Sequence, residues 1–290
     1  MQCVFTIAMI KTDILIIGAG PTGLFAVFEA GLLQLKCHII DALPMPGGQL
    51  SELYPKKPIY DIPGFPEVLA GDLVNNLMEQ IKPFSPGFTL GERAEKIEKQ
   101  SDGSFIVTTD KGTAHHTKVV AIAGGLGSFE PKKPPIEGIE SWEDKGVSYM
   151  IKDPEVYRNK KVLIAGGGDS ALDWTIFLAD VASEVTLVHR RSEFRGALDS
   201  VEKVQALKNS AKINLITPAE VIGLAGDTQL NKAFIQKAGE EAPIELSVDA
   251  FIPLFGLSPK LGPIGAWGLE IEKNAIVVDN TLDYMTNIPG

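Results

Sequence analysis

The sequence predicts an α/β protein with two domains, each built on a parallel sheet that helices cover. The main observation is a repeated order of segments. An apolar run, a glycine-rich turn, a helical segment and a second apolar run follow one another at 13–42 and again at 160–191. A strand–helix–strand order of this kind favours parallel pairing of the two strands.

Two further observations predict how the domains are connected. The proline-rich stretch 131–135 lies between the copies and marks a domain crossing. The apolar run 248–259 predicts a strand that returns the chain. We therefore expect one domain over 10–124 and 249–290, with a second domain over 125–248 inserted in it.

The composition agrees with this and excludes several classes of protein. The chain has 290 residues, 44% of them hydrophobic, which suits about two globular domains. A net charge of −10 without a long basic tract argues against nucleic-acid binding. No apolar run reaches the roughly 18 residues of a membrane span. Cys3 and Cys37 match no metal-ligand spacing and predict a reducing cytoplasm. Because "MIKTDILIIGAG" from Met9 has the form of a complete beginning, residues 1–8 are expected to be an extension.

The first half carries a glycine turn at the end of its first strand. The elements expected in this half are a strand and turn (13–23), a helix (24–35), a strand (37–42), a helix (71–84) and an antiparallel meander (88–124). The irregular, proline- and glycine-rich segment 44–66 between them is typical of a loop that covers a ligand.

This first turn has the pattern G-x-G-x-x-G at Gly18, Gly20 and Gly23. The first glycine permits a tight turn, the second lets the backbone approach a pyrophosphate, and the third lets helix and strand pack closely. The helix that follows would offer free N–H groups to the anion. Asp41 ends the next strand and can accept hydrogen bonds from a ribose diol. The turn therefore predicts a dinucleotide site; the alternative is that the glycines serve only turns and packing.

The second half repeats the turn as G-x-G-x-x-A at Gly166, Gly168 and Ala171. Its strand spans 162–165 and more strands are expected between about 213 and 248. The pattern predicts a second dinucleotide site.

At the ribose-reading position of this second unit stands a basic group instead of an acid. His189, Arg190 and Arg191 end the strand, and Arg195 follows. A carboxylate would repel a 2′-phosphate, whereas the planar donors of arginine suit one. This favours NADP(H), and the alternative is a solvated basic patch on a loop. Two dinucleotide sites on one chain suit a resident FAD and an exchanging NADPH, with the protein positioning the rings.

Several motifs resemble one family. They are "GAGPTGL" (18–24), "GGQLSELYPKKPIYDIPGFP" (47–66), "AGGLGSFEPKKPP" (123–135), "GGGDSALDW" (166–174) and "VHRRSEFRG" (188–196). Together they resemble the two-domain flavoproteins of the pyridine nucleotide-disulphide oxidoreductase superfamily, and within them the ferredoxin–NADP⁺ reductases of the thioredoxin-reductase-like type. The resemblance implies two Rossmann-like, three-layer (ββα) domains, with the NADP-binding domain inserted in the FAD-binding domain.

The resemblance also implies the ligand-binding residues. Those on the FAD side are Gly18, Gly20, Pro21, Thr22, Gly23, Asp41, Gly48, Gln49, Leu50, Tyr54, Asp61, Ala94, Ala123, Gly124 and Phe129. Those on the NADP(H) side are Gly166, Gly168, Asp169, Ser170, Ala171, His189, Arg190, Arg191 and Arg195.

The redox dithiol of thioredoxin reductases is missing from the place where the resemblance puts it. After "GVSY" (146–149) the sequence has Met150 and Asp153, and a thioether is not a dithiol. No side chain is assigned a catalytic role, because the flavin carries the chemistry. The expected activity passes hydride from NADPH to FAD and then single electrons to ferredoxin or flavodoxin. The alternatives are another NADPH-dependent reductase with a quinone, dye or external dithiol protein as acceptor, and a non-catalytic redox sensor.

Three smaller expectations complete the resemblance. The family's usual state is a homodimer. An acidic ferredoxin would dock on basic residues, for which Lys56, Lys57, Lys132 and Lys133 are the candidates. The family continues past "NIPG" into a strand and a Gly-Asp that contacts FAD, so this chain, ending at Gly290, is expected to bind FAD weakly.

Overall fold

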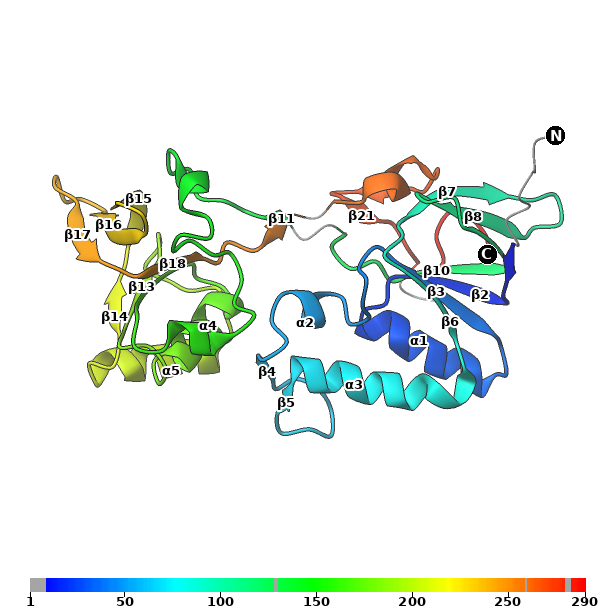
Figure 1. Ribbon diagram of the computed structural model, residues 1–290, viewed down its shortest axis with the longest axis horizontal. Coiled ribbons are helices and arrows are strands. Elements are labelled where there is room, and N and C mark those ends of the chain that lie inside the picture. Colours follow the sequence, from blue (N-terminus) through cyan, green and yellow to red (C-terminus); the bar gives the residue numbers. More distant parts are fainter. Residues whose placement is uncertain (1–8, 128–129, 259, 280–282) are drawn as a thin grey trace. The chain divides into compact units, whose positions relative to one another are not determined.

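The computed structural model describes residues 9–127, 130–258, 260–279 and 283–290, and these form two units (Figure 1). Unit 2 is Glu130–Ser258, and unit 1 contains the described residues before and after it. The expected extension 1–8, with Cys3, lies outside the described residues.

Unit 1 is built on a parallel sheet with the strand order β10-β2-β3-β6. Its strands are β2 (Ile14–Ile17), β3 (Cys37–Asp41), β6 (Gly87–Leu90) and β10 (Val119–Ile122). The central strands are buried and apolar, as expected for a sheet covered on both faces. Because all four strands are parallel, their carboxyl ends meet at one edge, where the glycine turn also lies.

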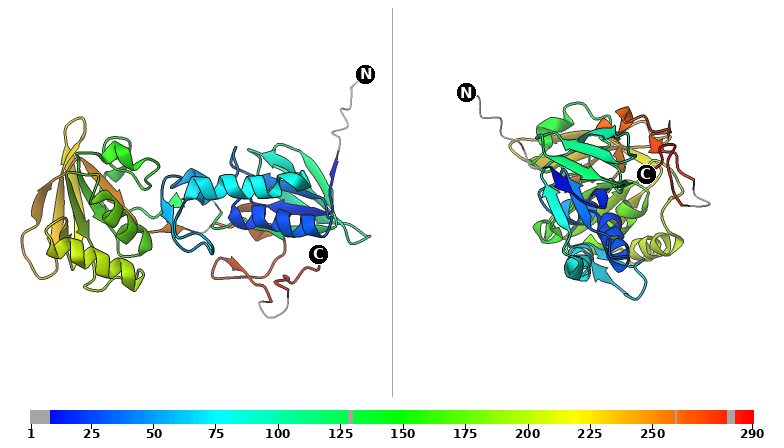
Figure 2. Two further views of the ribbon diagram at one scale, coloured as in Figure 1. Left: turned by 90° about the horizontal axis from the view of Figure 1, so that it is seen from below. Right: turned by 90° about the vertical axis from the view of Figure 1, so that its right-hand side faces the viewer.

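Two helices cover one face of this sheet and a second sheet covers the other. The helices α1 (Pro21–Leu32) and α3 (Ala70–Ile81) lie side by side in Figures 1 and 2. The second sheet, of order β1-β9-β8-β7, consists of β1 (Ile10–Lys11), β7 (Ala94–Lys99), β8 (Phe105–Thr109) and β9 (Ala114–Thr117). The expected meander over 88–124 is therefore shorter, since β6 and β10 join the parallel sheet instead.

Apolar side chains fill both interfaces of these three layers. Ile16, Leu24 and Ile39 are buried between the parallel sheet and the helices. Leu15, Ile40 and Val107 are buried between the two sheets. Alternate residues of β2 thus point to opposite faces, as the period of a strand requires.

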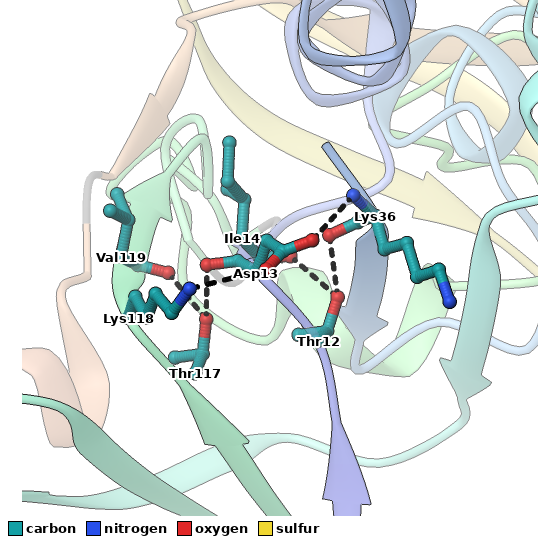
Figure 3. Close-up of polar contacts among 7 residues, drawn as sticks. All are labelled: Thr12, Asp13, Ile14, Lys36, Thr117, Lys118 and Val119. Carbon is teal, nitrogen blue, oxygen red and sulfur yellow. Dashed lines mark hydrogen bonds and ion pairs between the residues drawn. The ribbon is translucent and has the colours of Figure 1, made fainter. Parts of the chain in front are cut away.

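A polar network joins the amino ends of the parallel strands (Figure 3). The Asp13 carboxylate accepts a hydrogen bond of 3.0 Å from the Lys36 backbone N–H, and the Thr12 hydroxyl donates to the Lys36 carbonyl at 2.7 Å. On the other side, the Thr117 hydroxyl donates to the Asp13 carbonyl at 3.0 Å, and Lys118 Nζ lies 3.7 Å from the Asp13 carboxylate. These contacts lie at the opposite end of β2 from the glycine turn.

Short elements complete unit 1. They are α2 (Gln49–Glu52), β4 (Pro58–Ile59), β5 (Val68–Leu69), η1 (Lys82–Phe84), η4 (Gly262–Ala266), β20 (Ile271–Glu272) and β21 (Ala275–Ile276). The segment 44–66, expected to be irregular, contains only α2 and the start of the short β4–β5 pair.

Unit 2 repeats the plan of unit 1 with the parallel order β14-β13-β12-β18. Its parallel strands are β12 (Lys161–Ala165), β13 (Glu184–Val188), β14 (Asn214–Ile216) and β18 (Ala250–Pro253). The helices α4 (Asp169–Leu178) and α5 (Leu198–Asn209) lie on one face (Figure 1). On the other face pack the antiparallel strands β15 (Ala219–Gly226), β16 (Leu230–Lys237) and β17 (Ile244–Ser247).

The remaining elements of unit 2 are the short helices η2 (Ile139–Trp142) and η3 (Pro154–Tyr157) and the paired strands β11 (Glu130–Pro131) and β19 (Leu257–Ser258). β18 pairs with β12, so the apolar run that begins at residue 248 belongs to unit 2. The chain returns to unit 1 after Ser258 and not at residue 249. Among the described residues, no helix is long and apolar enough to cross a membrane.

Candidate functional site

The first glycine turn connects β2 to α1, and each glycine has a different surrounding. Gly18 has φ +109°, and a Cβ on it would lie 2.4 Å from the Ala123 carbonyl oxygen. A Cβ on Gly23 would lie 1.9 Å from the Gly18 carbonyl oxygen. A Cβ on Gly20 would meet no atom within 4 Å. Gly18 and Gly23 are thus required by packing, whereas Gly20 leaves open space before the amino end of α1, which fits a pyrophosphate.

Asp41 lies at the carboxyl end of β3, beside this turn. Its carboxylate accepts hydrogen bonds from the backbone N–H of Ala19 at 2.6 Å and of Leu43 at 2.8 Å. A carboxylate has about four acceptor positions, so two remain for a ligand such as a ribose diol. The half-buried Asp41 carboxylate is therefore held in place in part by the backbone of the glycine turn, through Ala19.

The loop 44–66 is joined to the same turn. The Gly47 N–H donates to the Ala19 carbonyl at 2.8 Å, and a Cβ on Gly48 would lie 3.2 Å from Gly20 Cα. Gln49 begins α2 directly after Gly48. The structure thus brings the loop and the turn together, although they are far apart in the sequence.

Tyr54 and Asp61 lie further along this loop. Tyr54 is half-buried, and burial followed by the negative charge of Asp61 raises the pKa of its hydroxyl. Lys57 Nζ lies 5.6 Å from the centre of the Tyr54 ring. The phenol is therefore neutral at pH 7 and is available as a hydrogen-bond donor or a flat apolar surface.

The other residues expected on the FAD side lie around the turn in different ways. Ala123 and Gly124 directly follow β10, and the Ala123 N–H donates to the Ile17 carbonyl at 2.8 Å. The methyl group of Ala94 is buried between the two sheets, which leaves only its backbone for a ligand. The Leu50 side chain packs against the core. Pro21 and Thr22 begin α1, and Phe129 lies outside the described residues.

The second glycine turn, between β12 and α4, has the same division of roles. A Cβ on Gly166 would lie 2.7 Å from the Leu254 carbonyl oxygen, whereas a Cβ on Gly168 would meet no atom within 4 Å. Ala171 is fully buried on the first turn of α4. The open space again lies before the amino end of a helix. Asp169 and Ser170, the first residues of that helix, are exposed, and Asp169 accepts a hydrogen bond from the Ala197 N–H at 2.7 Å.

The basic group at the end of β13 lies beside this second turn. Arg190, Arg191 and Arg195 are exposed, and no ion pair or side-chain hydrogen bond to a described residue involves them. By contrast, Arg93 pairs with Glu95 at 2.8 Å and Arg158 with Glu155 at 2.6 Å. Three arginines without an acidic partner provide the positive charge that a phosphate needs.

The position of the missing dithiol is filled by residues with structural contacts. The Met150 carbonyl accepts a hydrogen bond from the Ser148 hydroxyl at 2.7 Å. Asp153 caps η3 by accepting the Glu155 N–H at 3.1 Å. Cys37 is buried in β3, and burial raises the pKa of its thiol, as does Asp13. Among the described residues, then, no thiol is placed for redox chemistry, and no cluster of His, Cys, Asp and Glu could hold a metal ion.

Two glycines were not singled out from the sequence, one in the loop 44–66 and one in the second turn. Gly47 and Gly167 are both buried, and a Cβ on Gly167 would lie 2.2 Å from the His189 ring. Gly167 is the middle residue of the second turn, where the first turn has Ala19. This difference between the two turns is the only signal for Gly167 in the sequence.

Comparison with known proteins agrees with this geometry. Residues 12–290 match the model of the pyridine nucleotide-disulphide oxidoreductase family. The chain is 76% identical to "Ferredoxin--NADP reductase 1" of Christiangramia forsetii, over 97% of this chain and 80% of the relative. It is 53% identical to "Ferredoxin--NADP reductase" of Mesorhizobium japonicum, over 97% of this chain and 82% of the relative.

Two thioredoxin reductases are among the solved structures with the same fold. That of Lactococcus lactis superimposes with a TM-score of 0.82 at 25% identity, covering 97% of this chain and 88% of the other. That of T. acidophilum has a TM-score of 0.83 at 22% identity, with the same coverage. Each of the two Rossmann-like units thus has the fold found in these enzymes.

Proposed function

Because this chain belongs to the pyridine nucleotide-disulphide oxidoreductase family, and within it to the ferredoxin–NADP reductases of the thioredoxin-reductase-like type, we propose that it is a flavoprotein that reduces ferredoxin with NADPH. It binds FAD and NADP(H). Bound FAD would supply the chemistry, namely uptake of a hydride from NADPH and release of the electrons one at a time to a one-electron acceptor. The residues of the chain bind and orient the two cofactors.

Unit 1 is the proposed FAD site and unit 2 the proposed NADP(H) site. In unit 1, Gly20 and the amino end of α1 would face the pyrophosphate, and Asp41 the ribose diol. In unit 2, Gly168 and the amino end of α4 would face the second pyrophosphate. The arginines at 190, 191 and 195 would hold the 2′-phosphate.

One observation carries this assignment. The two units have the same strand, turn and helix, but opposite charges follow the second strand of each. Asp41 ends β3 in unit 1, and the unpaired arginines follow β13 in unit 2. A ribose diol needs acceptors and a ribose phosphate needs positive donors, so the charges separate the two cofactors.

Electron transfer through a thiol of this chain is not supported by any described residue. The buried Cys37 thiol is held in its neutral form, and Met150 and Asp153 stand where the dithiol would be. An external dithiol protein, a quinone or a dye as acceptor, and a non-catalytic sensor, have no observation that favours them over ferredoxin.

Stopped-flow spectroscopy tests the first half of this function. Mixing the FAD-loaded protein with NADPH should bleach the flavin absorbance, and NADH should do so much less efficiently. A flavin that stays oxidised would contradict an NADPH-dependent reductase and leave a passive binder. Cytochrome c reduction that depends on added ferredoxin tests the second half.

The partner, the assembly and the compartment are further parts of this proposal. Ferredoxin is the partner that the relatives' names state, and flavodoxin is an additional proposed acceptor. A homodimer in the cytoplasm is proposed from the family resemblance and from the reduced, buried Cys37. Among the lysines considered for docking, Lys133 is paired with Glu143 at 2.6 Å.

A further inference from the structure

Unit 2 contains a histidine whose ring is enclosed by the arginine-bearing loop. His189 is 7% exposed. Its Nε2 lies 3.2 Å from the Glu193 carbonyl oxygen, and its ring stacks on Phe194 with the centres 5.3 Å apart and the planes at 19°. Because a carbonyl only accepts, Nε2 carries the hydrogen. The ring therefore contacts the loop between Arg191 and Arg195 through both an edge and a face.

The same ring occupies the space above Gly167 in the glycine turn. A Cβ on Gly167 would lie between 2.2 and 2.5 Å from three atoms of the His189 ring. The backbone of Gly167 is not in the left-handed region that favours glycine. Space for the ring is consequently the reason for a glycine at this position.

Unit 1 provides an internal comparison. There the middle residue of the turn is Ala19, and Asp41 takes the place of His189. An alanine is thus compatible with this kind of turn when no ring lies above it. The glycine at 167 and the histidine at 189 belong together.

The backbone of the loop is joined to the turn at two more points. The Arg195 N–H donates to the Gly167 carbonyl at 2.7 Å, and the Ala197 N–H donates to the Asp169 carboxylate at 2.7 Å. A Cβ on Gly196 would lie 2.6 Å from Leu172 Cδ1, so the loop is packed directly on α4. The three exposed arginines lie on this anchored segment.

We propose that His189 is a positioning residue: with Gly167 and Phe194 it fixes the loop so that Arg190, Arg191 and Arg195 stand ready for the 2′-phosphate. This rests on the proposed NADP(H) site and assigns the phosphate contacts to the arginines and not to the imidazole. Burial lowers the pKa of His189. The hydrogen bond to the Glu193 carbonyl opposes this and the positive charges of Arg190, Arg195 and Arg191 add to it, so the pKa stays lowered and the ring is neutral at pH 7. A neutral ring suits support of the loop better than attraction of a phosphate.

Calorimetric titration with NADP⁺ and NAD⁺ tests the proposal, because these ligands differ only in the 2′-phosphate. The native protein should prefer NADP⁺. Gly167→Ala should push the ring and the loop aside and reduce that preference by about tenfold, the loss expected for one charge-assisted hydrogen bond. His189→Ala should reduce it similarly. In the double variant the second change should add little, because the alanine methyl then meets no ring.

Gly265→Ala is the matched control, since a Cβ there meets no atom within 4 Å and the residue lies in unit 1. Phe194→Leu removes the stack without changing the turn and should also reduce the preference for NADP⁺. It replaces Gly167→Ala as the test if that variant does not fold. Equal weakening of NADP⁺ and NAD⁺ by Gly167→Ala, or additive effects in the double variant, would overturn the positioning role. A native protein without preference for NADP⁺ would overturn the proposed cofactor itself.

Discussion

At the scale of single residues, the difference between the two cofactor sites comes down to a few side chains beside similar backbone turns. Gly20 and Gly168 both leave open space before a helix. Gly18 and Gly166 both lie close to a carbonyl oxygen that follows a neighbouring strand, that of Ala123 and that of Leu254 respectively. What differs is the charge at the end of the second strand, where unit 1 has Asp41 and unit 2 has Arg190 and Arg191 after the neutral His189. We propose that this charge difference sets which dinucleotide each unit prefers.

The arginines can be tested directly. Replacing Arg190 and Arg191 together by alanine should raise the KM for NADPH by roughly tenfold or more, because hydrogen bonds to a charged group contribute about 1.5–3 kcal/mol each. The KM for NADH should change little. Arg158→Ala, which removes an arginine already paired with Glu155, is the control and should leave both unchanged. Equal increases for both nucleotides would contradict phosphate recognition.

A buried pair of histidines in unit 1 should make its stability depend on pH. The Thr89 hydroxyl lies 2.8 Å from His38 Nε2 and 3.0 Å from His115 Nε2. Burial lowers the pKa of His38 to about 4, with His115 adding to the effect, and burial also lowers the pKa of His115. Since the folded state favours the neutral rings, the stability is fully present above pH 6.5 and is lost as the pH falls toward 4. Urea unfolding followed between pH 7 and pH 4 should show this loss, and a midpoint that stays constant would contradict it.

The bridging hydroxyl offers a second test of the same cluster. Thr89→Val keeps the shape but leaves two buried imidazole nitrogens without their partner. The free energy of unfolding should fall by roughly 1–3 kcal/mol at pH 7. Thr228→Val, at an exposed threonine between β15 and β16, is the control and should change it little.

The sequence predicted the glycines and Asp41 because the spacing of the motif alone determines them. Gly167 and the His38–Thr89–His115 cluster could not be predicted in this way. They depend on contacts between residues that are far apart in the chain, such as Gly167 with His189.

At the scale of elements, the parallel strands of unit 1 are fixed at one end and used at the other. At the amino end of β2, hydrogen bonds connect this strand to the neighbouring strands on both sides. They are made by Thr12, Asp13 and Thr117 (Figure 3). The register that results places Gly18, Asp41 and Ala123 at the same edge. The polar network thus fixes the amino ends of the strands, while the carboxyl ends of the same sheet carry the proposed ligand-binding residues.

Asp13→Ala should therefore weaken the sheet without touching the cofactor edge. It removes the acceptor of the Lys36 N–H and the partner of Lys118, in a partly exposed setting, so a loss of about 1 kcal/mol is expected. Thermal unfolding measures this loss. The KM for NADPH should stay unchanged, and a large change in it would show that the base of the sheet affects the other unit.

Most elements were predictable, and α5 shows why one was not. The helix expected over 71–84 is found as α3 and η1, and the expected strands of both glycine turns are present. In α5, only Val204 is buried. The apolar residues Leu198, Val201, Val204 and Leu207 recur every three residues, so they drift around the helix and form no single apolar face with the 3.6-residue period that identifies one. The helix is held by its packing beside α4.

At the scale of the whole molecule, each unit has its own core and its own proposed cofactor. Unit 1 has a core on each face of its parallel sheet. In unit 2 one core lies between the parallel and antiparallel sheets, and Leu172, Leu178 and Val204 are also buried on the helices α4 and α5. The sequence predicted the insertion but placed the return at residue 249. The run 248–254 is mostly apolar, as a central strand of either unit would be. Only its pairing with β12 shows that it belongs to unit 2.

Ligands should consequently stabilise the units separately. Adding adenosine 2′,5′-bisphosphate to the flavin-loaded protein should raise the melting temperature of unit 2, because at one hundred times its Kd the ligand adds roughly 2.7 kcal/mol to the free energy of unfolding. Differential scanning calorimetry should show one transition moving and the other staying. If a single transition moved as a whole, the units would unfold together.

The pairing of β11 with β19 has a consequence for how such proteins can be rebuilt. Glu130 and Ser258, the two ends of unit 2, are opposite each other on neighbouring strands. Unit 2 is also one uninterrupted stretch of chain. Unit 2 should therefore be transferable as one insertion into a single loop of another protein, because its two ends lie side by side. The proposed coenzyme preference would be transferred with it.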